Sequence, residues 1–164
     1  MIAIKTIMAV CFALSLSNAA ADPLGDMDGH WTGSGWARET PDGPKETVRC
    51  RLDNHFDSGQ LKLTVSGRCV VPGRKIRLSG EIEGKDGSDR ISGHWFNPDG
   101  IGSAAISGIQ RENLIAFTFR AWDPATGRNL AQNIEWRTSG TTLWLRSTDR
   151  EDPEITMSDL EFSR

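Results

Sequence analysis

Short stretches of alternating apolar and polar residues recur from residue 29 to residue 164, and no stretch shows a convincing helical period. Alternation with a period of two is typical of strands that bury one face. Clusters of Gly, Pro, Asp and Asn, such as Pro41-Asp42-Gly43-Pro44, interrupt the stretches and favour turns. The pattern predicts ten strands, near residues 30–38, 45–55, 60–71, 74–84, 90–96, 103–110, 114–122, 130–138, 141–148 and 155–163.

The connections between these predicted strands are short, which favours antiparallel pairing of sequential neighbours. Each strand has one apolar and one polar face, as in a sheet that covers a single core. The sequence therefore predicts an all-β fold, an antiparallel up-and-down β-barrel of about 8–10 strands that closes on itself and leaves no edge. A two-sheet β-sandwich is the alternative.

Two cysteines lie on the apolar faces of neighbouring predicted strands. An antiparallel register around the turn at Asp57-Ser58-Gly59 places Cys50 opposite Cys69, and Leu52 opposite Gly67. Opposite residues on one face have Cβ atoms about 4.5–5.5 Å apart, which is close enough for a disulfide after slight adjustment. The sequence thus predicts a disulfide between Cys50 and Cys69, with two buried free thiols as the alternative.

The first 21 residues have the pattern of a secretory signal peptide. Lys5 precedes an apolar run over 7–16, and small residues follow it. A membrane span needs about 20 apolar residues, so this run is too short, and a buried N-terminal helix is the alternative. We expect a signal peptide over 1–21 and a single β-barrel domain over 22–164 without a transmembrane segment. We also expect a periplasmic or secreted bacterial protein, because an oxidising compartment would preserve the disulfide.

The charge of the chain bears on whether the protein binds nucleic acid. The chain has 19 Lys and Arg and 22 Asp and Glu, for a net charge of −3. Along the sequence the basic residues are scattered among acidic ones rather than gathered in a stripe. A nucleic-acid-binding protein usually has a concentrated basic surface, so we expect no nucleic-acid partner.

The segment Gly29-His30-Trp31-Thr32-Gly33-Ser34-Gly35 resembles the G-x-W opening of calycin-type barrels, and more closely the G-x-W-x-G-x-G start of nitrobindin-like proteins. The resemblance implies that Trp31 plugs one end of a barrel whose cavity binds a small apolar molecule or haem. Nitrobindin-like proteins carry a haem-ligating histidine late in the chain, whereas the last histidine here is His94. The resemblance therefore bears on the fold more than on any activity.

The chain has six tryptophans and no tyrosine. Five aromatic residues fall on the predicted apolar faces and are the candidate lining of a ligand cavity: Trp31, Trp95, Phe117, Phe119 and Trp136. The alternative is that they pack a filled core. Three further tryptophans, Trp36, Trp122 and Trp144, fall near strand ends or on the faces opposite to the apolar ones. We expect loops to cover them partly; the alternative is an exposed patch for a partner or a glycan.

Signs of catalysis or metal binding are missing from the sequence. His30, His55 and His94 are predicted to point outward, and their spacing matches no pair of metal ligands. No G-x-S-x-G elbow is present, and the segment Asp86-Gly87-Ser88-Asp89 lacks the full EF-hand pattern. We therefore expect no enzyme activity, no catalytic residue, no cofactor and no metal.

Two functions remain open. The first is a non-catalytic periplasmic barrel that binds a small apolar or aromatic ligand. The second is an envelope protein-interaction module or inhibitor, with a filled barrel that acts through the loops near 39–45, 123–129 and 149–154. Asn54 and Gln132 are polar residues that are expected to face the interior, where they orient a ligand or bind a buried water.

Overall fold

The structure is a computed structural model that describes residues 22–98, 100–124 and 127–164. Within these residues the chain forms a short 3-10 helix, η1 (Gly25–Met27), and ten strands. The strands are β1 (Gly29–Ala37), β2 (Glu46–Asp57), β3 (Lys62–Val71), β4 (Arg74–Lys85), β5 (Ser88–Asn97), β6 (Gly102–Arg111), β7 (Leu114–Asp123), β8 (Arg128–Ser139), β9 (Thr142–Asp149) and β10 (Thr156–Ser163).

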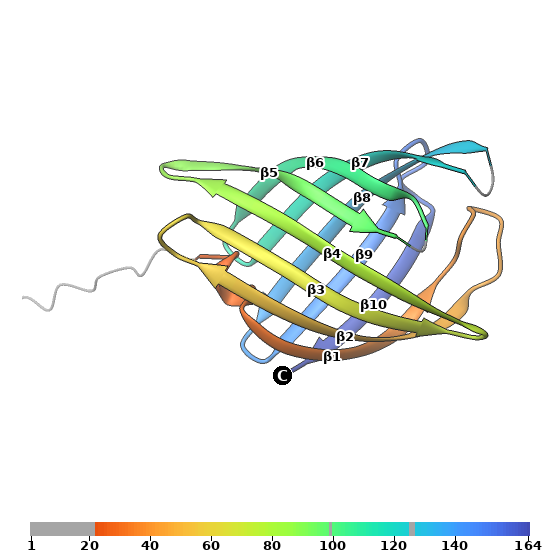
Figure 1. The fold of residues 1–164 in the computed structure, drawn as a ribbon, viewed down its shortest axis with the longest axis horizontal. Coiled ribbons are helices and arrows are strands. Elements are labelled where there is room, and N and C mark those ends of the chain that lie inside the picture. The colour runs from red at the N-terminus through yellow and green to blue at the C-terminus, as the bar shows by residue number, and fades with distance from the viewer. Residues whose placement is uncertain (1–21, 99, 125–126) are drawn as a thin grey trace, which may run out of the picture.

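Every described strand pairs antiparallel with its neighbours in sequence, and β1 pairs with β10 to close the barrel (Figure 1). At this seam Gly35 lies opposite Leu160. The predicted fold class, an all-β up-and-down barrel, is confirmed, and the sandwich alternative does not apply. Closure follows because ten strands in simple order leave two free edges, which satisfy each other's backbone groups.

The two faces of each strand have the predicted environments. On β2, Val48, Cys50 and Leu52 point into the barrel and are at least 95% buried, while Arg49 and Arg51 between them are exposed. The same alternation continues on β3 and β4. The wall is therefore apolar inside and polar outside, as period-two patterning requires.

The predicted disulfide is present. Cys50 lies directly opposite Cys69 in the β2–β3 ladder, and their sulfur atoms are bonded. Leu52 faces Gly67 in the same register. The bridge stands on the inner face of the wall and crosses between two strands joined by a short hairpin turn.

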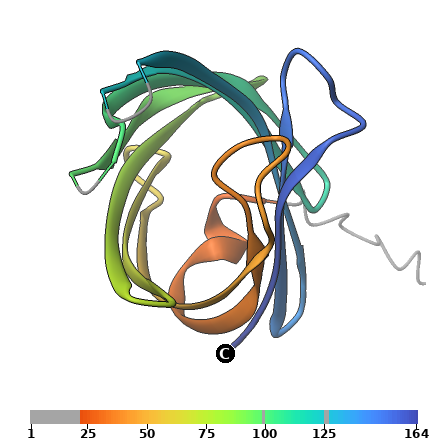
Figure 2. The ribbon, with the colours of Figure 1, turned by 90° about the vertical axis from the view of Figure 1, so that its right-hand side faces the viewer.

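The two ends of the barrel differ in their connections. At one end the chain turns tightly between β2 and β3, β4 and β5, β6 and β7, and β8 and β9, and η1 lies across it; we call this the closed end. At the other end longer loops cover 38–45 and 150–155, and we call this the open end. Figure 2 looks into the barrel from the open end, with η1 at the far side.

The predicted signal peptide over 1–21 lies outside the described residues. In the part of the chain that the structure describes, no helix is long and apolar enough to cross a membrane. A barrel that carries a disulfide is consistent with an extracytoplasmic location, because disulfides persist in oxidising compartments.

Candidate functional site

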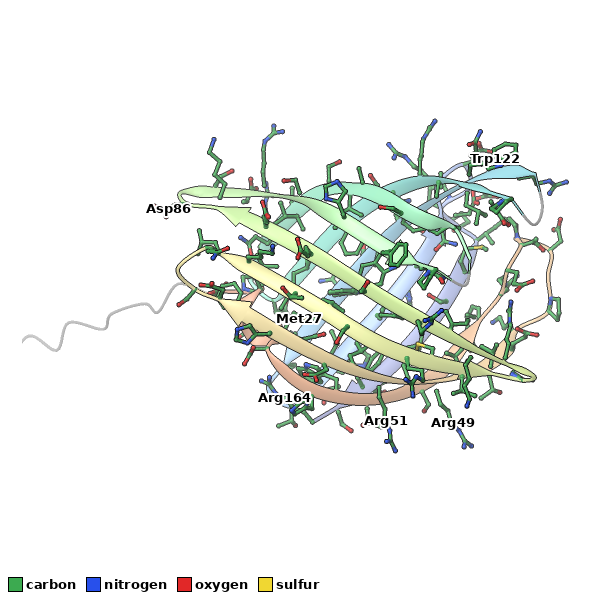
Figure 3. The ribbon with its side chains drawn as sticks, viewed as in Figure 1. Met27, Arg49, Arg51, Asp86, Trp122 and Arg164 are labelled. Atoms are coloured by element: carbon green, nitrogen blue, oxygen red, sulfur yellow. A yellow bond between two sulfur atoms is a disulfide. The ribbon has the colours of Figure 1, made fainter. Side chains whose placement is uncertain are left out.

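The closed end is filled by protein atoms. The carbonyl oxygen of Met27 in η1 accepts hydrogen bonds from Trp31 Nε1 at 2.9 Å and from Asn54 Nδ2 at 3.0 Å. Leu24 and Met27 are almost fully buried, with 1% and 0% exposure. The Arg164 guanidinium lies 4.5 Å from the centre of the Trp31 ring and donates to the carbonyl oxygen of Asp28 at 2.5 Å. Trp31 is thereby fixed between η1 and Arg164. Met27 of η1 and Arg164 are labelled in Figure 3.

The half of the barrel towards the open end is hollow. A cavity of about 590 Å³ lies inside the wall, which is within the range of about 300–1,000 Å³ for small-molecule sites. Its lining is predominantly apolar and comes from most strands of the barrel. The apolar lining residues include Val48, Leu52, Val71, Ile76, Leu78, Ile101, Leu130, Ile134, Leu145, Met157, Leu160 and Phe162.

An aromatic cluster forms part of the cavity wall. The rings of Trp95 and Trp136 are 5.8 Å apart and nearly perpendicular, and Phe117 lies 5.5 Å from Trp136 in a similar edge-on geometry. Phe119, from the same strand as Phe117, also lines the cavity. Edge-to-face contacts at these distances are favourable because the positive edge of one ring meets the negative face of the other.

The structure therefore brings together four of the five aromatic residues predicted to line a cavity: Trp95, Phe117, Phe119 and Trp136. Trp31 is separate from them. It faces the interior as predicted, but it lies at the closed end, where η1 and Arg164 cover it, and it is not part of the cavity lining. Alternation along a strand predicts which face a residue takes, but not the depth at which it lies in the barrel.

A few polar groups interrupt the apolar lining. Ser147 Oγ and Ser158 Oγ share a hydrogen bond of 2.6 Å between β9 and β10. Gln132 also lines the cavity, as predicted. Asn54 instead lies buried at the closed end, where its side-chain amide donates a hydrogen bond to the carbonyl oxygen of Met27. Trp136 is 2% exposed, and its Nε1 has no hydrogen-bond acceptor among the described residues. An apolar cavity with few polar groups favours apolar ligands, which these groups can orient.

Charged side chains surround the entrance at the open end. Arg74 forms ion pairs with Glu39 and with Glu46, the latter at 3.2 Å. Partial burial opposes the charge of Arg74, but hydrogen bonds and charges from both glutamates outweigh it and raise the pKa of the guanidinium. Arg38 Nη1 donates to the carbonyl oxygen of Pro41 at 2.8 Å, and its Nε is buried without an acceptor among the described residues. Sequence reasoning missed this entrance because its members come from loop and strand-end positions, where alternation carries no signal.

The three loops suggested as an interaction surface all connect strands at the open end. Close to them, Trp122 is 57% exposed, and Trp144, further along the outer wall, is 41% exposed. The expected partial covering of these two tryptophans by loops is therefore wrong, because both point outward from strands of the barrel. Trp36 is half-buried, and Lys45 Nζ lies 3.7 Å from the centre of its ring.

The histidines take the outward orientation predicted for them. The side chains of His30 and His55 are 85% and 82% exposed and lie near Asp53 and Asp28, and His94 is also exposed. None of the three lines the cavity. Among the described residues, no group of three or more His, Cys, Asp or Glu is placed to hold a metal ion.

The chain was compared with family models and with curated proteins, and neither comparison found a match. The closed ten-stranded antiparallel barrel of the described residues is compatible with a calycin-like fold.

Proposed function

We propose that this protein is a non-catalytic barrel, exported to the periplasm or secreted, that binds a small apolar or aromatic molecule through its open end. The observation that carries the proposal is the cavity of about 590 Å³ with its wall of Trp95, Phe117, Phe119 and Trp136. Apolar ligands gain free energy from leaving water for such a lining, and aromatic ligands gain further from edge-to-face contacts.

The residues in the cavity favour an organic ligand over haem held by histidine. The described lining contains no imidazole, and both of its cysteines are bonded to each other. The nitrobindin-like relationship suggested by the Gly29–Gly35 segment therefore supports the barrel and its Trp31 plug, but the histidine ligand of that family has no counterpart in this lining.

Native mass spectrometry of the protein purified from its host, compared with the same sample after denaturation, tests the proposal. We expect excess native mass that is released as a small molecule on unfolding. A bare mass, unchanged after exposure to lipids and aromatic metabolites, would contradict ligand binding. That result would favour the interaction module, whose test is charge reversal at the exposed Glu151 and Glu154 of the β9–β10 loop.

A pair of variants locates the ligand. Ile134→Trp adds volume inside the cavity, whereas Glu135→Trp adds the same side chain to the exposed outer face of β8. We expect Ile134→Trp to weaken binding of a fluorescent apolar dye, anilinonaphthalene sulfonate, at least tenfold, and Glu135→Trp to change it less than twofold. Equal affinity in a folded Ile134→Trp variant, with unchanged far-ultraviolet circular dichroism, would place the dye outside the barrel.

A further inference from the structure

Five cations gather on the outer wall formed by β2, β3 and β4. Arg49, Arg51, Arg68, Lys75 and Arg77 all point outward and are exposed, and we call them the basic patch. Figure 3 shows Arg49 and Arg51 extending away from the barrel. Basic residues are scattered along the sequence but not on this surface, because strand pairing brings three separate segments together.

The pairing places like charges directly opposite each other. Arg51 faces Arg68, and Arg68 in turn faces Arg77, so one row across three strands consists of arginines. In the next row Arg49 and Lys75 stand on either side of Val70. Neighbouring strands are about 4.7–4.9 Å apart, and like charges directly opposite on one face are destabilising.

Most of the patch has no internal counter-charge. Arg49, Arg51, Arg68 and Lys75 form no ion pair with any residue that the structure describes. Elsewhere on the outer wall, cations do have partners: Lys62 Nζ lies 2.8 Å from Glu81, and Arg146 lies 2.7 Å from Asp159. The charges of these four residues are therefore available to an anion from outside the molecule.

The surface between the arginines suits phosphate groups. Two shallow depressions of about 600 and 970 Å³ meet at Arg51 and Arg68, and hydroxyl side chains such as Thr32 and Ser66 line them. Each depression also contains one carboxylate, Asp53 in the first and Glu161 in the second, which its cations outnumber. Guanidinium groups bind phosphate through paired N–H donors, and the hydroxyls supply further donors.

Exposed apolar side chains accompany the cations. Val70, between Arg49 and Lys75, is 46% exposed, and Phe96, beside the depression that contains Arg77, is 45% exposed. A soluble polyanion without apolar groups, such as polyphosphate, gains nothing from valine and phenylalanine. A bilayer surface offers phosphates and an apolar boundary at once, and basic segments with aromatic and aliphatic residues bind there.

We propose that the basic patch docks the barrel on an anionic phospholipid surface, with the arginines on headgroup phosphates and with Val70 and Phe96 at the boundary with the acyl chains. Docking of this kind does not depend on what the cavity holds. It is peripheral, and it weakens with salt because the contacts between exposed charges are screened.

Co-sedimentation with vesicles tests the proposal on the processed, disulfide-bonded protein. We expect binding to vesicles of phosphatidylglycerol and phosphatidylcholine at low salt, loss of binding at high salt, and little binding to phosphatidylcholine alone. Each cation near an anionic surface contributes about a fivefold factor to affinity. The double change Arg51→Ser and Arg68→Ser should therefore weaken binding about 25-fold, without lowering the thermal midpoint, because it removes repulsion.

The matched control changes two arginines on the opposite wall, Arg120→Ser on β7 and Arg137→Ser on β8, for the same change in net charge. It should leave vesicle affinity within about twofold of the starting protein. An equal loss of vesicle affinity in both double variants would show an effect of net charge and would overturn docking through the basic patch. The absence of binding to anionic vesicles at low salt would overturn it as well. Unchanged vesicle affinity after Val70→Ser and Phe96→Ser, with full competition by soluble polyphosphate, would overturn the bilayer as partner.

Discussion

Gly80 shows how one residue shapes the cavity. It lies directly opposite Trp95 on the inner face of the barrel, and a Cβ placed on it would overlap the indole of Trp95. The same Cβ would lie 3.2 Å from the carbonyl oxygen of His94. Because glycine has no side chain, the indole can lie against β4 and still reach Trp136. The aromatic wall thus depends on a residue that contributes no side-chain atom to it.

Gly80→Ala is expected to displace the Trp95 ring and to lower the free energy of unfolding by about 1–3 kcal/mol, the usual cost of overpacking a filled site. Thermal unfolding measures the loss, and near-ultraviolet circular dichroism reports the changed Trp95–Trp136 geometry. The control, Ser79→Ala on the outer face of the same strand, should change stability by less than about 0.5 kcal/mol. A Gly80→Ala protein with unaltered stability and aromatic spectrum would mean that the indole has another place to lie.

At the scale of elements, the β2–β3 hairpin contains the disulfide of the barrel. Cys50 and Cys69 are 19 residues apart in sequence, and the bridge joins strands that are already paired. Its two cysteines also line the cavity, so it stiffens the wall near the entrance. On the chain-entropy model a bridge across about 15–20 residues stabilises by about 3 kcal/mol, because it restricts the unfolded chain.

Replacing both cysteines, Cys50→Ala and Cys69→Ala, should lower the thermal midpoint by more than about 5 °C for a domain of this size. The double change avoids a free thiol. Reduction of the natural protein is the control and should lower the midpoint by a similar amount. If the midpoint in oxidising buffer were the same with and without the cysteines, the bridge would contribute nothing to stability.

Across the whole molecule, one half of the barrel is filled and the other is hollow. Fully buried inner residues such as Leu63, Ile82, Ile115 and Leu143, with 0–1% exposure, lie at strand ends near η1. Towards the open end the inner positions face the cavity, and some of them, such as Leu130, are only half-buried. The filled half provides a close-packed core and the hollow half provides the binding volume, so stability and binding use different parts of one wall.

Amide hydrogen exchange should reveal this asymmetry. Amides of Leu63, Ile82 and Leu143 should exchange only through global unfolding, whereas those of Leu130 and Gln132 should exchange at least tenfold faster through local opening. Both sets lie in paired strands, so secondary structure alone does not produce the difference. Equal protection at the two ends would mean that the hollow half is as rigid as the filled half.

The sequence by itself determined the strands, their inward and outward faces and the cysteine pair. These features are local: alternation has a period of two, and the hairpin turn near Ser58 fixes the register that places Cys50 opposite Cys69. The Gly29–Gly35 segment also predicted Trp31 at one end of the barrel, and Trp31 lies at the closed end, where its Nε1 donates to the carbonyl oxygen of Met27.

Only the tertiary structure decided which inward residues share a space. Trp31 and Trp95 both face the interior of the barrel, yet η1 covers Trp31 whereas Trp95 lines the cavity. The two residues lie at different depths along the barrel axis, and these depths are fixed only when the barrel closes. Closure and register likewise bring Arg51, Arg68 and Arg77 into one row, although they are far apart in sequence. Alternation is the same in a filled and a hollow barrel, so the volume left inside depends on how side chains from opposite walls meet.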